Sequence, residues 1–208
     1  MEKTTTEEIL GQETSRDLEI LKKFYLLKDF YLAGGTGLAL QLGHRRSYDL
    51  DFFTSKSFRE MVFIKKISAL GHFELDKKEA GTAIGTFRKT RVSFFRYPFS
   101  LLKKPKTILG LKVADLIDIA CMKIDAVATR GSKKDFIDLY MIIQNGYTLK
   151  GLLQNFQKKY TGVKFNMVHI QKGLAFFEDA EKEALPIMLK PISWEQIKQF
   201  FLKEVKSL

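Results

Sequence analysis

The sequence predicts a mixed α/β fold (α+β), in which helices flank a small mixed sheet and a helical C-terminal part follows. Short apolar segments bounded by glycine alternate with helical patterns early in the chain, and residues 73–95 read as antiparallel strands. After Pro105, apolar residues recur at helical spacing. We assign residues 1–145 to a core with an N-terminal helix and residues 146–208 to a helical extension packed on that core as one unit.

The elements are expected in this order. The first helix begins near Thr14 or Ser15 and ends near Leu27, and a short buried strand follows at residues 30–33. A helix at 36–43, a strand at 50–53 and a helix at 57–70 precede the antiparallel strands. Further helices cover residues 111–130, a segment ending at Asn145, and several segments after Thr148.

Composition limits the function classes. The 35 Lys and Arg residues exceed the 24 Asp and Glu residues, giving a net charge of +11, so a polyanionic partner is expected. The single cysteine, Cys121, excludes an intramolecular disulfide and fits a buried core thiol. The polar N-terminus lacks a secretion signal, and no apolar run approaches the roughly 20 residues that cross a membrane. We therefore expect a cytoplasmic protein without a membrane partner.

Gly34 and Gly35 join the first expected strand to the next helix. The first amides of a helix lack intrahelical partners and lie at the positive end of its dipole, where they attract phosphate. Glycine lets a ligand approach the backbone, and Thr36 adds a hydroxyl at the capping position. The turn therefore predicts a phosphate site, although a Gly-Gly pair before a helix is also an ordinary tight turn.

Two carboxylates, of Asp49 and Asp51, follow on the second expected strand. Residues i and i+2 of a strand share a face, so these side chains are expected to converge. Like charges held together repel each other unless a cation lies between them, and Mg²⁺ suits a carboxylate pair that leaves its other positions to water and phosphate. We predict a metal site here; the alternative is a strand edge with solvated aspartates.

The segments "GGTGLAL" and "RRSYDLDFF" resemble the first motif of the nucleotidyltransferase superfamily, and most closely that of the abortive-infection toxin nucleotidyltransferases of the AbiEii/AbiGii type. The segment "MKIDAVATRGSKKDFIDLYMI", at residues 122–142, is similar to the Lys-then-Asp block of that family. The resemblance implies a nucleotidyltransferase-like sheet that transfers a nucleoside monophosphate from a triphosphate, with pyrophosphate leaving.

By position, the resemblance implies that Gly34, Gly35 and Thr36 hold triphosphate oxygens. Asp49 and Asp51 are then the ligands of Mg²⁺, with Mn²⁺ as an alternative.

The downstream motif implies that Lys123 contacts the triphosphate as a point charge, and that Asp135 or Asp138 orients this lysine or the acceptor. Structural alternatives exist for these residues. Ser132 and Asp135 fit a capping box that starts a helix. Asp138 lies in an otherwise apolar run and needs a partner, which Lys123 or Arg130 can supply.

The sequence departs from the family pattern at Ser93, because many nucleotidyltransferases carry a third carboxylate on such a later strand. Residues 80–114 contain no acid at all, so the usual general base is missing from this span. Basic residues interleave there with aromatic ones, a composition typical of nucleic-acid binding and equally of a solvated strand face. The basic residues are Arg88, Lys89, Arg91, Arg96, Lys103, Lys104, Lys106 and Lys112.

The sequence thus predicts a toxin-like, Mg²⁺-dependent nucleotidyltransferase acting on an RNA end, with tRNA as the first candidate, or on a protein hydroxyl. Arg45 and Arg46, just before the aspartates, are placed to touch phosphate or RNA, and His44 is expected at the surface. The alternative is a non-catalytic nucleic-acid-binding module on a degenerate nucleotidyltransferase fold. The resemblance also implies a cognate antitoxin.

Overall fold

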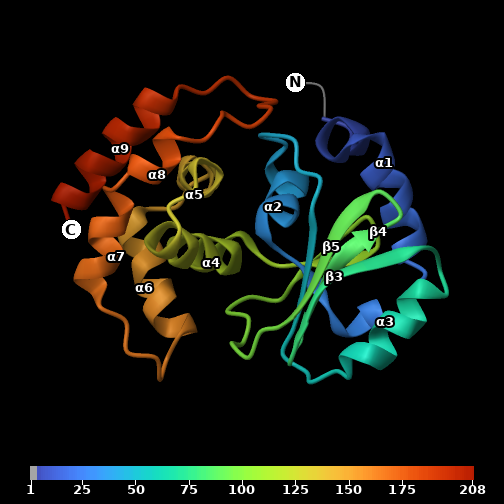
Figure 1. Cartoon of the computed structure of the whole chain (residues 1–208). Coiled ribbons are helices and arrows are strands. Elements are labelled where there is room, and N and C mark those ends of the chain that lie inside the picture. Colours follow the sequence, from blue (N-terminus) through green and yellow to red (C-terminus); the bar gives the residue numbers. More distant parts are fainter. Residues whose placement is uncertain (1–3) are drawn as a thin grey trace. The chain divides into compact units, whose positions relative to one another are not determined.

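Two compact units make up the chain in the computed structural model, which describes residues 4–208 (Figure 1). The first three residues of the polar N-terminus lie outside this range. One unit contains the residues up to Ser100 together with Lys104–Ala114, and the other contains Leu101–Lys103 with Asp115–Leu208. This division differs from the expected one between residues 145 and 146, because the helices before residue 145 pack against the later helices.

The strands between residues 4 and 208 form one seven-stranded sheet in the first unit, in the order β3-β4-β5-β2-β1-β7-β6. The pairs β2–β5 and β1–β7 are parallel and the other neighbours are antiparallel, so the predicted mixed sheet is confirmed. The strands are β1 (Tyr31–Leu32), β2 (Leu50–Thr54), β3 (Phe73–Glu79), β4 (Thr82–Phe87), β5 (Thr90–Arg96), β6 (Lys106–Ile108) and β7 (Leu111–Val113).

The central strand β2 separates the two faces of the sheet. Leu50, Phe52 and Thr54 are buried, whereas Asp51 and Phe53 alternate with them on the other face. Phe52 stacks on Phe94 of β5 with ring centroids 5.5 Å apart. Because a one-residue slip would exchange the faces, this packing fixes the direction of the Asp51 side chain.

The helical elements of the first unit are α1 (Thr6–Leu21), the 3₁₀ helix η1 (Tyr25–Asp29), α2 (Gly34–Leu42) and α3 (Glu60–Ser68). Helix α1 begins before the expected position because Thr5 and Glu8 form a capping box, and it bends at Gly11, whose φ is 72°. It also ends earlier than expected, where η1 replaces its last predicted turns.

The helix predicted over residues 111–130 is wrong at its start, because residues 111–113 form strand β7. This strand pairs with β1 through Leu32 and Val113 and with β6. The following helix starts only after Asp115, whose carboxylate accepts a hydrogen bond of 3.1 Å from the amide of Ile117. A strand of three residues is too short to show a periodicity that distinguishes it from a helix.

The second unit is helical, as predicted, and Figure 1 shows its helices gathered around α4. Its elements are α4 (Leu116–Thr129), α5 (Lys133–Gln144), α6 (Leu149–Lys159), α7 (Met167–Leu174), α8 (Glu178–Glu181) and α9 (Trp194–Lys206). Within residues 4–208, no helix has both the length and the apolar character that a membrane crossing requires.

A buried aspartate holds the β4–β5 hairpin against α1. Asp17 accepts hydrogen bonds from the amide of Lys89 (3.2 Å) and the hydroxyl of Thr90 (2.8 Å), and it pairs with Arg88 at 3.0 Å. Arg88 adopts a left-handed φ of 56° in the turn. The Asp17 carboxylate therefore anchors a turn that a non-glycine residue adopts only at some energetic cost.

We expect Asp17→Ala to lower the free energy of unfolding by about 2 kcal/mol, because the Thr90 hydroxyl and the Lys89 amide lose their acceptor. Urea denaturation followed by circular dichroism measures this loss. Glu13→Ala, which removes only an exposed pair with Lys89, is the control and should cause no measurable change. Equal effects of the two substitutions would contradict the anchoring role.

Candidate functional site

The turn between β1 and α2 lies close to the side chains of Arg45 and Asp51, which come later in the sequence. Gly34 has a left-handed φ of 62°, and a Cβ at this position would lie 2.9 Å from Oδ2 of Asp51. A Cβ at Gly35 would overlap the Arg45 guanidinium. The left-handed φ therefore favours glycine at position 34, whereas a side chain at position 35 would displace the end of the Arg45 side chain. The start of α2 thus lies next to a carboxylate and a guanidinium.

The N-terminus of α2 receives no side-chain cap, since its N-cap residue is Ala33. The amides of its first turn are accordingly available to an anion. The structure thus places the predicted phosphate-binding turn and Asp51 side by side.

The Thr36 hydroxyl forms hydrogen bonds within the protein, whereas the sequence predicted that Thr36 holds a triphosphate oxygen. Its hydroxyl is buried and forms hydrogen bonds with the carbonyl oxygen of Asp49 and, at 2.8 Å, with the hydroxyl of Ser47. A hydroxyl has a single proton to donate, so donation to the Asp49 carbonyl leaves none for a phosphate oxygen. Thr36 therefore positions the segment that carries Asp49.

The two predicted arginines differ in their surroundings. Arg45 is buried, with its guanidinium beside Gly35 and a hydrogen bond of 2.9 Å to the carbonyl oxygen of Arg46. Arg46 is exposed. His44, expected at the surface, is fully buried because the segment around it packs on α1, where the Ser47 amide donates to the carbonyl of Ile9 at 2.9 Å.

The two aspartates differ in their exposure and in their place relative to β2. Asp49 is exposed and directly precedes β2, and Asp51 is partly exposed within it. Asp51 is in register with Ser93 of the parallel strand β5, so a serine occupies the neighbouring position on the same face. Among residues 4–208, no three His, Cys, Asp or Glu side chains form a cluster that could hold a metal ion by themselves.

The donor set nevertheless fits Mg²⁺, which needs only one or two protein carboxylates when water and phosphate oxygens complete its shell. Asp49 and Asp51 can supply these carboxylates, and Gly34 leaves open the space beside Asp51 that a side chain would fill.

The downstream candidates form a buried ionic cluster in the second unit. The Lys123 ammonium lies 2.7 Å from Oδ1 of Asp135 and 2.6 Å from Oδ2 of Asp138. Arg130 adds hydrogen bonds of 2.7 and 3.0 Å to Asp135. Burial alone would raise the pKa of Asp135, but the Lys123 charge and the Arg130 contacts outweigh it, so this pKa lies below its usual range.

The observed contacts of Ser132 at the start of α5 are not those of the capping box that the sequence offered as an alternative role for Asp135. Ser132 is the N-cap residue of α5, but its hydroxyl bonds to Oε2 of Glu183 at 3.0 Å. The same carboxylate oxygen accepts from the amide of Lys133 at 2.9 Å, so Glu183 caps the helix. Sequence reasoning missed Glu183, because no local pattern links it to a helix start about 50 residues away.

The basic residues of the acid-free span are partly neutralised by acids from elsewhere in the first unit. Arg88 pairs with Asp17, Lys89 with Glu13 at 2.9 Å, and Arg91 faces Asp76 at 3.9 Å. In addition, the aromatic rings of Phe87 and Phe94 are fully buried and cannot stack on bases. This span is therefore not a continuous, unpaired basic face.

Comparison with known proteins identifies the family. The family model described as "Nucleotidyl transferase AbiEii toxin, Type IV TA system" matches residues 95–207, more than half of the chain. The chain belongs to the AbiEii nucleotidyltransferase toxin family. The matched span contains the Lys123 cluster but not the Gly34–Asp51 segment. An uncharacterised protein of Aquifex aeolicus (strain VF5) is 39% identical to this AbiEii-family chain over 202 residues, covering 95% of this chain and 96% of the relative.

Solved structures support the same fold. A putative nucleotidyltransferase from H. pylori has a TM-score of 0.56 at 15% identity and covers 94% of both chains. JHP933 from Helicobacter pylori has a TM-score of 0.52 at 14% identity and covers 95% of both chains. At these identities the likeness concerns the fold, and it agrees with the predicted nucleotidyltransferase-like sheet.

The lowered pKa of Asp135 predicts how stability depends on pH. An acid with a lowered folded pKa stabilises the fold above its unfolded pKa, and this contribution is lost as the pH falls through the folded value. We expect Asp135→Asn to lower the free energy of unfolding by about 3 kcal/mol at neutral pH, and by progressively less as the pH falls through the lowered pKa of the wild-type acid. Urea denaturation at several pH values measures the difference.

Asp125→Asn, on the neighbouring helix α4, is the matched control. Burial raises the pKa of Asp125, so its ionised form disfavours the fold at neutral pH. Its substitution should therefore leave stability unchanged or increase it at neutral pH. An equal loss from both substitutions would show that the Asp135 ion pairs do not stabilise the second unit.

Proposed function

We propose that this chain is a Mg²⁺-dependent transferase that moves a nucleoside monophosphate from a nucleoside triphosphate to an acceptor. The observation that best supports this proposal is the approach of the Gly34 backbone to the Asp51 carboxylate at the start of α2. A metal-bound triphosphate needs amide donors and carboxylate oxygens on neighbouring elements, and this turn offers both.

Each residue of the turn has a distinct part in the proposal. The first amides of α2, at Gly35 and Thr36, bind anionic phosphate oxygens, and Arg45 adds a positive charge beside them. Asp49 and Asp51 provide the metal ligands, for Mg²⁺ or Mn²⁺. When bound, the ion neutralises phosphate charge and orients the phosphates for in-line displacement.

In this proposal, the serine at position 93 concerns activation of the acceptor and not binding of the nucleotide. Phosphoryl transfer has a loose transition state, so positioning and charge stabilisation supply most of the catalysis, and little depends on early proton removal. A serine hydroxyl next to Asp51 does not replace a carboxylate as proton acceptor, but for this reason its presence is compatible with transfer. Within the second unit, we propose that Asp135 and Asp138 orient the Lys123 ammonium.

We propose an RNA end as acceptor, with tRNA as the first candidate, and a protein hydroxyl as the alternative. The net charge of +11 favours a polyanion. The family description names a type IV toxin–antitoxin system, so we also propose that an antitoxin protein counteracts the activity.

A second function is favoured specifically by Ser93 and the missing third acid: a nucleic-acid-binding module without catalysis. In that case RNA binding weakens steeply with salt, with a slope of roughly −0.7 per neutralised phosphate on a log–log scale, while no triphosphate is consumed. Incubation with each labelled triphosphate, Mg²⁺ and total RNA or protein separates the two functions, because only an enzyme leaves label on an acceptor.

We expect Asp49→Asn and Asp51→Asn each to reduce transfer of labelled nucleoside monophosphate at least about 100-fold, because loss of a metal ligand removes several kcal/mol of charge stabilisation. Asp76→Asn, which changes an aspartate on β3, is the control and should retain activity. Circular dichroism checks that all three variants are folded. Unchanged transfer in both site variants would remove the metal role from this pair.

A further inference from the structure

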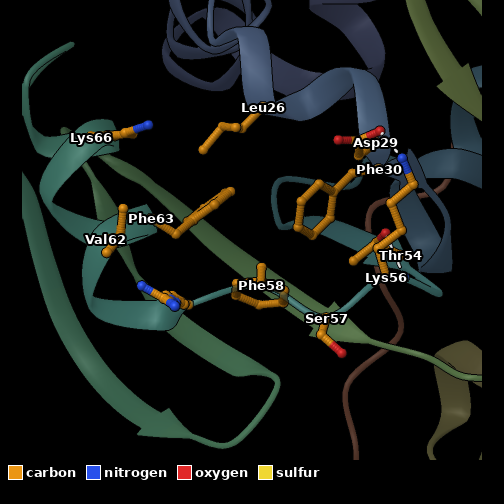
Figure 2. A pocket seen from close by; sticks show the side chains of 11 residues that line it. Leu26, Asp29, Phe30, Thr54, Lys56, Ser57, Phe58, Val62, Phe63 and Lys66 are labelled. Atoms are coloured by element: carbon orange, nitrogen blue, oxygen red, sulfur yellow. Dashed lines mark hydrogen bonds and ion pairs between the residues drawn. The ribbon is translucent and has the colours of Figure 1, made fainter.

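A cavity lies in the first unit, away from the Gly34–Asp51 turn. It has a volume of about 290 Å³ and opens between η1, the loop after β2 and helix α3 (Figure 2). Thr54, at the end of β2, lines it. The side chain of Thr54 belongs to the face of β2 that carries Phe52, opposite to Asp51, so the sheet itself lies between this pocket and the predicted metal ligands.

Three phenylalanine rings form the apolar side of the pocket. The centroids of Phe30, Phe58 and Phe63 lie 5.3–5.5 Å from one another. Phe30 and Phe63 are buried, whereas Phe58 remains partly exposed. Figure 2 shows these rings around the hollow, below Leu26. Aromatic surfaces of this kind bind flat rings by stacked or edge-to-face contact, and the cavity volume is near the lower end of ligand pockets.

The polar rim of the pocket is positively charged. Asp29 is the sole acid among the described lining residues, and its ion pair of 2.6 Å with Lys56 neutralises it. The hydrogen bond from Lys56 also holds the pKa of Asp29 below its usual range. Figure 2 shows this pair at one edge of the pocket and Lys66 at another.

Two cations of the rim lack a carboxylate partner. Arg59 is exposed, and within residues 4–208 its guanidinium makes no ion pair and no hydrogen bond. Lys66 donates to the hydroxyl of Tyr25 and lies 5.1 Å from the centroid of that ring, but it pairs with no acid in the described part of the chain. The pocket therefore joins an aromatic surface to two positive charges available to an anion.

We propose that this pocket binds a nucleotide, with the base against the partly exposed ring of Phe58, which the buried rings of Phe30 and Phe63 hold in place, and with the phosphate near Arg59 and Lys66. Bases stack on aromatic side chains irrespective of sequence, and a guanidinium suits a phosphate. A free mononucleotide and an unpaired nucleotide of an RNA share this chemistry. The proposal uses none of the residues assigned to catalysis and does not depend on that function.

Titration of ¹⁵N-labelled full-length protein with AMP, GMP, CMP, UMP and hexauridylate, in EDTA, tests the pocket without the metal site. We expect saturable shift changes at the amides of Ser57, Phe58 and Arg59, with a Kd of about 1 mM or tighter. Nucleosides, which lack the phosphate, should bind about tenfold more weakly. Binding of mononucleotides indicates a free ligand, and saturation by hexauridylate alone indicates RNA.

Arg59→Gln should weaken binding about tenfold, because it removes the charged donor without breaking a contact of the fold. Lys65→Gln is the matched control: it removes an equal charge from the same region but lies outside the pocket lining, so binding should be unchanged. Asp51→Asn should also leave binding unchanged, which separates this pocket from the catalytic proposal.

Three outcomes would overturn the nucleotide assignment. The first is the absence of saturable shifts up to about 10 mM of every nucleotide. The second is an equal loss of affinity in Arg59→Gln and Lys65→Gln, since this would reflect only the net charge. The third is binding of an acidic peptide that contains phenylalanine in place of nucleotides, which would assign the pocket to a protein partner.

Discussion

The absence of a side chain at two successive positions is the constraint on which the candidate site depends. Gly34 brings the backbone against the Asp51 carboxylate, and Gly35 makes room for the Arg45 guanidinium. A Cβ at position 34 would strain the left-handed backbone, and a Cβ at position 35 would displace the Arg45 guanidinium. The sheet holds the other side fixed, because β1 lies between β2 and β7. A positive helix end and a carboxylate are thus held together, which is the arrangement a metal-bound phosphate requires.

Buried charges organise the helical unit through pairing. Asp118 and Lys159 are both fully buried and 2.7 Å apart, and Asp118 also accepts from the amides of Leu102 and Lys103. This explains why residues 101–103 belong to the helical unit although strands precede and follow them. The Lys123 cluster follows the same principle, since each buried charge has an opposite partner. Desolvation offsets much of the attraction within such pairs, so loss of one partner costs stability mainly because it leaves a buried charge unpaired.

The positive side chains of the protein differ between regions in whether an acid pairs with them. In the β4–β5 hairpin Arg88, Lys89 and Arg91 face acids of α1 and β3. At the rim of the pocket beside α3, Arg59 and Lys66 pair with no carboxylate of residues 4–208. Net charge from composition therefore overstates the basic surface in one region. The number of cations without an acidic partner describes the basic surface better than net charge does. This number can be obtained only from the folded structure.

The sequence by itself determined the local features of this protein. The Gly-Gly turn, the i, i+2 spacing of Asp49 and Asp51, the serine in place of a third acid and the helices of the C-terminal half follow from φ preferences and residue periodicity, which act over a few residues. Tertiary structure decided what depends on distant partners. It made residues 111–113 a strand beside β1, buried His44 against α1, capped α5 with Glu183 and turned the Thr36 hydroxyl toward Asp49. Each of these results from a contact between segments far apart in the chain, for which the local sequence carries no signal.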